Sequence, residues 1–426
     1  MTRDRLGAGS GRGPMNWCDL FSFHDGPTTH VFVPAEPDLA RAVHDVVRMA
    51  LRDPDLLRGL SRIAPLVPEE KRQGQLEWEL IGQFIGRILN RADAVHAETD
   101  QELFAIYRQI EQARFAPRLT GDVIIPLVAV SFDTTEPIHV DGETWIEPLT
   151  EADHRSRSMN WIRHDGVSAW VAAAATHAVV TRGVTFANQV HPLGVGSQGG
   201  LPPEFQYSMA HAVAEATYIV AGSVTGHAQV LVRPHGWADD WLHDLPPLWS
   251  AWEARAYPES LNERSWLNER TPISGEQTAE VAQVSKALRT APANVKLAAR
   301  RCRQNVFRGD VEDMVLDSAI GLEALLGKDR DALTHRMAQR AALILAEDVE
   351  PSLTYDVLKQ FYGIRSTIAH GGKPKRWTLK VGDVNLDVAQ TGTFFLKMLL
   401  RNILLAKEPW TAESVDELML ERFARE

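Results

Sequence analysis

The sequence predicts an α+β protein in which a mixed α/β region precedes an all-α helical bundle. Residues 123–149 contain β-branched apolar runs and an Asp-Gly turn signal, which favour strands. Beyond Pro272, apolar residues recur instead at the spacing of amphipathic helices. The chain has 426 residues, 44% apolar and 24% charged, which excludes disordered, collagen-like and coiled-coil classes. That length suffices for about two or three packed domains.

Charge, cysteine content and the N-terminus restrict the class of protein further. The net charge of −11 argues against a protein that coats duplex DNA through an all-over basic surface. Cys18 and Cys302 are the only cysteines, so neither a disulfide framework nor a thiolate zinc site is indicated. The first residues lack the apolar core of a signal peptide, and no run reaches the roughly 18 apolar residues of a membrane span. We therefore expect a cytoplasmic protein without a membrane partner, with Met1 or Met15 as its start.

The part of the chain before residue 273 is expected to hold a tail and one mixed region. Residues 1–34 predict a loose tail that begins with a Gly/Arg-rich stretch. Asp38 to Arg114 has mostly helical periodicity, and 123–132 predicts a buried strand. The segment 139–149 predicts a hairpin that turns at Asp-Gly. Residues 35–272 are thus expected to be mixed α/β, with a boundary near 120 left open.

Capping residues predict the first helices after Pro272. Ser274 and Gln277 are expected to form a capping box, and Pro292 breaks the helix that follows. Asn294 is expected to cap a second helix that runs through Phe307.

A third helix is expected to open at Asp310 and to end at Gly327. It is apolar on most of its circumference, which predicts the central helix of a bundle. The remaining expected elements are helices over 333–346 and 352–370, a short hairpin over 377–387, and a helix over 391–406. We therefore expect a bundle over 273–410 and an acidic C-terminal tail over 411–426.

The segment FYGIRSTIAHGG, residues 361–372, holds the best candidates for chemistry. Arg365 and His370 lie five residues apart near the end of an apolar helix. A guanidinium can grip a phosphate with two hydrogen bonds, and an imidazole titrates near neutral pH. Together they are the minimum for cleaving RNA without a metal, with the imidazole as base and the guanidinium offsetting charge. Judged on spacing alone, however, a helix-terminal histidine and an ion-paired arginine are the more common explanation.

No cofactor or metal site is predicted. The sequence GVGSQG at 194–199 resembles a dinucleotide-binding loop, but prolines follow too closely for a helix to start within the glycines. Among the many histidines, Asp240 and His243 are the best pair for a metal, yet no acidic cluster completes a ligand set.

Three ordered motifs make the functional interpretation of Arg365 and His370 more specific than their spacing alone. They are DMVLDSAIGLEALLG (313–327), THRMAQRAALILA (334–346) and FYGIRSTIAHGG (361–372). Together they closely resemble the ApeA-like branch of the HEPN superfamily over about residues 275–408. The resemblance implies an all-α HEPN bundle that forms a homodimer, so that two R-x4–6-H motifs share one cleft. Catalytic members are metal-independent endoribonucleases of toxin–antitoxin, abortive-infection and other anti-phage systems.

The resemblance also implies roles for individual residues. Arg365 and His370 correspond to the two essential catalytic positions. Glu323 falls at the acidic position of the third helix, where it would either orient Arg365 or His370 or serve only as an ion-pair partner. Ser366 stands where many active members have Asn, Asp or His, and a serine hydroxyl is a weaker, uncharged orienting group. The cations that follow the glycines could track an RNA backbone at the mouth of the cleft, although a solvated charged loop is the commoner explanation; they are Lys373, Lys375 and Arg376.

Two functional hypotheses follow. The first is an RNA-cleaving toxin or anti-phage effector, a hydrolase acting on tRNA or mRNA, in which residues 35–272 serve as a sensor or regulatory part. It would respond to an antitoxin or a trigger protein. The second is a HEPN fold kept as a non-catalytic dimerisation or nucleotide-binding module, in which Arg365 and His370 bind a ligand or another chain.

Overall fold

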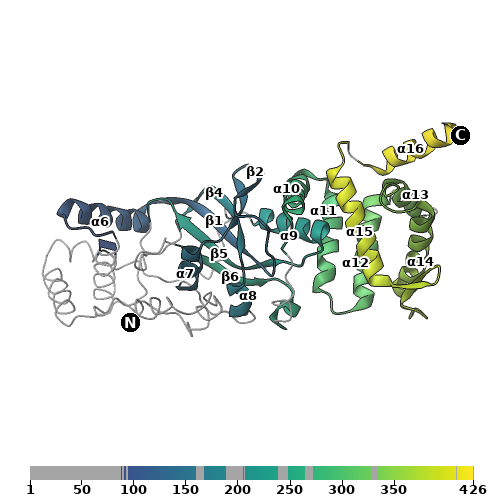
Figure 1. Cartoon of the computed structure of the whole chain (residues 1–426), viewed down its shortest axis with the longest axis horizontal. Coiled ribbons are helices and arrows are strands. Elements are labelled where there is room, and N and C mark those ends of the chain that lie inside the picture. Colours follow the sequence, from purple (N-terminus) through teal and green to yellow (C-terminus); the bar gives the residue numbers. More distant parts are fainter. Residues whose placement is uncertain are drawn as a thin grey trace.

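The computed structural model describes residues 88, 91–92, 95–159, 167–188, 205, 207–237, 248–263, 272–327, 333–408 and 410–425. Within these ranges the chain is α+β, with an antiparallel sheet in the middle and a helical region at the C-terminal end (Figure 1). This confirms the predicted fold class in its coarse form. The tail expected over 1–34 and the helices expected before residue 88 lie outside the described residues.

A six-stranded sheet forms the centre of the molecule in the order β2-β3-β4-β1-β5-β6, and all its neighbouring strands are antiparallel. The predicted strand and hairpin are confirmed as β1 and as β2 and β3, which turn at Gly142 with a φ of 52°. The strands are β1 (Arg118–Val128), β2 (Ile138–Asp141), β3 (Thr144–Pro148), β4 (His177–Ala187), β5 (Gly226–Pro234) and β6 (Trp249–Ala256).

Helices cover both faces of this sheet. On one face, α7 (Glu151–Met159) is tied to β5 because the buried Arg157 donates to Gln229 at 3.1 Å. The short α8 (Ala169–Ala173) packs on β1 and β5 beside Tyr257. The other face packs against α9 (Ser208–Ala221), which continues into the C-terminal helices through α10 (Gly275–Thr290). One apolar core therefore runs from the sheet into the helical region.

The helical region is organised around α12 (Val311–Leu326), which contacts each of its bundle neighbours. Asp310 caps it and Gly327 ends it, as the sequence predicts. Its buried residues include Leu322, and its contacts with α11, α13, α14 and α15 agree with the predicted central place. The other elements are α11 (Ala293–Gln304), α13 (Leu333–Ile344), α14 (Pro351–Ala369), β7 (Thr378–Val381), β8 (Val384–Asp387) and α15 (Val388–Leu405).

The predicted start of α11 is wrong. The helix begins at Ala293 with Pro292 as its N-cap residue, so Asn294 already lies within the first turn. From there its amide donates to the carbonyl of Ala324 at 3.1 Å and joins α11 to the C-terminal end of α12. The last predicted turn, Asn305–Phe307, is a 3-10 helix.

The acidic segment predicted as a C-terminal tail forms a helix, α16 (Ala412–Arg425). Its N-terminal half is held on α13, because Val415 is buried and Asp416 accepts two hydrogen bonds from the buried Arg340. The rest of α16 projects from the bundle (Figure 1). Every helix of the described ranges falls short of the length and apolar content that a membrane crossing needs.

Further toward the N-terminus, α6 (Asp100–Phe115) is confirmed at the end of the predicted helical stretch. Thr99 caps it through a full capping box with Glu102. Ile106 and Ile110 are buried, as their helical spacing predicts, while Leu103 is partly buried beside them.

Candidate functional site

Helices α12 and α14 bring Glu323 and Arg365 together. The two residues are far apart in sequence, yet the Arg365 Nη2 lies 2.8 Å from the Glu323 Oε1. The side chains remain 31% and 26% exposed, respectively, so the pair lies at the surface of the bundle rather than inside it. Glu323 and Arg365 thus form an ion pair between α12 and α14.

The Glu323 carboxylate lacks hydrogen-bond donors in this pair. Burial raises its pKa, and the Arg365 guanidinium only partly opposes that effect. The Oε1 atom is buried and makes no hydrogen bond with any described residue, because its contact with Arg365 lacks hydrogen-bond geometry. The Nε of Arg365 is also buried and without a hydrogen bond among the described residues. The pair therefore keeps hydrogen-bonding capacity that a ligand or water can use.

Tyr362 is a third member of this cluster, and the sequence reasoning missed it. Its side chain is 4% exposed, and its buried hydroxyl has no hydrogen-bond partner among the described residues. Burial raises the pKa of Tyr362 well above 10.0; Glu323 adds to the effect and Arg365 opposes it. A signal was present in the sequence, since Tyr362 lies three residues before Arg365 and on the same side of a helix.

His370 is exposed at the C-terminal end of α14, where it serves as the C-cap residue. The chain turns immediately afterwards at Gly371, whose φ is 74°. The five residues from Arg365 to His370 correspond to a rise of about 7.5 Å and a rotation of about 140° along a helix. Within one chain the guanidinium and the imidazole therefore lie on different sides of α14, and no hydrogen bond or ion pair of the described residues joins them.

Ser366 is exposed on the same side of α14 as His370, four residues before it. Its backbone carbonyl accepts from the His370 N–H at 3.2 Å. Its hydroxyl makes no hydrogen bond with the described residues, so it does not orient Arg365 or Glu323.

The predicted RNA-binding cations Lys373, Lys375 and Arg376 are all exposed in the segment after α14. None of them forms an ion pair with any residue that the structure describes, so their charge is available to solvent. The segment is anchored at its far end because Gln360 of α14 exchanges two hydrogen bonds with the backbone of Lys380 on β7, at 2.9 and 3.0 Å. The three cations are thus held near the His370 end of α14.

The arrangement offers two chemical functions. His370 is an exposed group able to take or give a proton, and Arg365 is a fixed cation able to offset charge on a phosphate.

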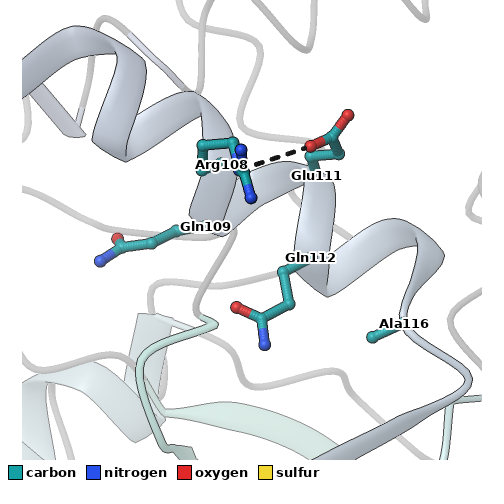
Figure 2. Close-up of a pocket in the computed structure, with 5 residues that line it drawn as sticks. All are labelled: Arg108, Gln109, Glu111, Gln112 and Ala116. Atoms are coloured by element: carbon teal, nitrogen blue, oxygen red, sulfur yellow. Dashed lines mark ion pairs between the residues drawn. The ribbon is translucent and has the colours of Figure 1, made fainter. Parts of the chain in front are cut away.

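A separate cavity of about 590 Å³ lies along α6 and is shown in Figure 2. Arg108 and Glu111 form an ion pair of 3.9 Å at its edge. The other lining residues are Gln109, Gln112 and Ala116. None of the predicted site residues belongs to this cavity, and Figure 1 places α6 at the opposite end of the molecule from α14.

No group of three His, Cys, Asp or Glu side chains suitable for a metal occurs within the described ranges. The GVGSQG segment, Asp240 and His243 lie outside the described residues. Several of the other histidines are buried, and burial lowers the pKa of His154 and of His227 to about 3. Comparisons with protein-family models, with curated proteins and with solved structures found no match for this chain.

Proposed function

We propose that the C-terminal helices form a HEPN-type bundle and that the protein is a metal-independent endoribonuclease. The observation that carries the proposal is the surface pair of Arg365 with Glu323 of α12, in which Arg365 belongs to the helix that ends at the exposed His370. The three sequence motifs that resemble the ApeA-like branch contain all of these residues. The free cations after α14 add a surface that attracts an RNA backbone.

The proposed reaction needs no group beyond these side chains. The His370 imidazole takes the proton of a ribose 2′-hydroxyl, and the 2′-oxygen forms a bond to the adjacent phosphorus. Arg365 offsets the negative charge that develops on the phosphoryl oxygens. The bond from phosphorus to the 5′-oxygen then breaks, and the imidazole of a second copy protonates the leaving oxygen. The products are a 2′,3′-cyclic phosphate and a 5′-hydroxyl end, and the active form is a homodimer.

Such an enzyme fits an effector of toxin–antitoxin or anti-phage systems, acting in the cytoplasm on tRNA or mRNA. In this proposal the sheet and the helices that cover it sense an antitoxin or a trigger protein. The continuous core between the sheet and the bundle supports such coupling, because a change in one part can be transmitted through packed side chains.

The direct test is to incubate purified protein with total RNA or tRNA in EDTA. We expect wild type to cleave, and Arg365→Ala and His370→Ala to lose about 100-fold or more of the rate. Matched controls are Arg401→Ala, which removes an exposed ion-paired arginine on α15, and His335→Ala on α13. No cleavage by wild type, or equal cleavage by the two site variants, would contradict the proposal.

One observation favours the second hypothesis, a non-catalytic dimerisation or nucleotide-binding module. Ser366 is exposed and bonds to neither Arg365 nor Glu323 within the described residues, so the site lacks the orienting group of many active relatives. If wild type is harmless on overexpression and Ser366→Asp becomes toxic, this rival is supported. A wild-type protein that is already toxic, and that His370→Ala makes harmless, contradicts it.

A further inference from the structure

Three buried polar atoms without a hydrogen-bond partner gather at the α12–α14 contact. They are the Glu323 Oε1, the Arg365 Nε and the Tyr362 hydroxyl, each judged against the residues that the structure describes. Both charged groups influence the pKa of Tyr362, so the hydroxyl lies within electrostatic reach of the pair. Unpartnered buried polar groups destabilise a fold, and most proteins keep few of them. Their concentration at one surface pair therefore indicates a site kept for function rather than for stability.

The Tyr362 ring has an ordinary packing role, whereas its hydroxyl does not. The ring packs edge-on against Phe361 at 5.6 Å and belongs to the bundle core. A phenylalanine would fill the same space, so core packing does not require the oxygen. Because burial and the Glu323 charge raise the pKa of Tyr362, the hydroxyl stays protonated and is available as a hydrogen-bond donor.

The Arg365–Glu323 pair has to change when a phosphate binds. A guanidinium that turns its Nη atoms to a phosphate gives up part of its contact with the carboxylate. Glu323 would then be a partly buried anion with a weakened partner, which is costly unless another donor replaces the arginine. Apart from Arg365 itself, Tyr362 carries a buried, unused donor, and its pKa is affected by the Glu323 charge.

We propose that Tyr362 is a positioning residue whose hydroxyl donates to Glu323 when Arg365 turns to the substrate phosphate. This inference rests on the proposed ribonuclease function. Tyr362 does not touch the reacting atoms in this role. It keeps the Glu323 carboxylate in place, and the carboxylate keeps the guanidinium aimed at the phosphate.

The test compares Tyr362→Phe with wild type in two measurements on the full chain. The first is the thermal midpoint without RNA, which we expect to stay the same or to rise, because the variant loses an unpartnered buried hydroxyl. The second is steady-state cleavage of an RNA oligonucleotide in EDTA, for which we expect kcat to fall about tenfold with little change in KM. Tyr355→Phe is the matched control, because the Tyr355 hydroxyl bonds to His335 away from the pair; it should leave kcat unchanged.

The outcomes separate this inference from the function on which it rests. If wild type cleaves and Tyr362→Phe cleaves equally well, the positioning role is wrong while the ribonuclease stands. If Tyr362→Phe loses activity only together with a lower thermal midpoint, the hydroxyl is structural and the inference is also wrong. If wild type itself does not cleave, the proposed function is wrong and the role of Tyr362 falls with it.

Discussion

Asp317 of α12 holds two arginines of the preceding segment, and replacing it by alanine is expected to destabilise the bundle. Its side chain is 4% exposed. It accepts from the Arg301 Nη1 at 2.7 Å and from the Arg308 Nε at 2.8 Å. These bonds fix α11 and the turn after it against α12, the helix that carries Glu323.

The size of the effect follows from the exposure of the partners. A hydrogen bond to a charged group contributes about 1.5–3 kcal/mol, and removing one partner of a buried pair costs about 3–5 kcal/mol. Arg301 and Arg308 keep 31% and 38% exposure, so water recovers part of that loss. We therefore expect Asp317→Ala to lower the free energy of unfolding by about 2–4 kcal/mol. Asp317→Asn keeps the shape and one acceptor, so it should lose about half as much.

Urea unfolding followed by circular dichroism measures this directly, with an unchanged slope showing that the transition remains comparable. Asp313→Ala is the matched control, because Asp313 is exposed and its contact with Arg308, at 3.7 Å, is too long for a hydrogen bond. It should change the free energy of unfolding by less than about 0.5 kcal/mol. If Asp317→Ala loses no more than Asp313→Ala, the two arginine bonds do not stabilise the bundle and the reasoning is refuted.

Three further predictions concern the site, the packing and the pH dependence. Glu323→Gln removes the charge that holds Arg365, so RNA cleavage in EDTA should fall about tenfold, and an unchanged rate would contradict this. Gly392→Ala would place a Cβ 2.4 Å from Phe361, so calorimetry should show a loss of about 1–3 kcal/mol, and a higher thermal midpoint would refute the clash. Burial raises the pKa of Glu215 on α9 from 4.5 to about 7. The folded state therefore gains stability from protonated Glu215 below pH 4.5, and this gain is lost as the pH rises through 7. The urea-derived stability of wild type should therefore fall by about 2–3 kcal/mol across that window, and Glu215→Gln should remove this fall.

Features that depend on neighbouring residues could be predicted from the sequence. Asp310 begins α12 with a local side-chain hydrogen bond, and Gly327 ends it in an extended conformation; both ends are confirmed. The hairpin turn at Gly142 needs a positive φ that glycine adopts without strain. The prediction for Asn294 failed because Pro292 starts the helix earlier, and the free amide then bonds to α12.

The candidate site residues could also be identified from the sequence, but the contacts between them could not. Periodicity placed Arg365 on an apolar helix and His370 at its end, and the structure has both there. It could not show that Glu323 is the partner of Arg365 or that Tyr362 joins them, because those contacts depend on how α12 packs against α14. Nor did the acidic composition of the last residues show that Asp416 binds the buried Arg340.

The sequence by itself determined the strand and hairpin between residues 118 and 148 and most of the helices after Pro272, together with the side chains proposed to act on RNA. These properties depend on residues within a turn or two of one another, whose interactions exist in any fold. Only the tertiary structure decided the strand order, with β4 and β5 on either side of β1, and the meeting of Glu323, Tyr362 and Arg365. Such contacts join distant segments, and many pairings have similar local energies, so packing of the whole core selects among them.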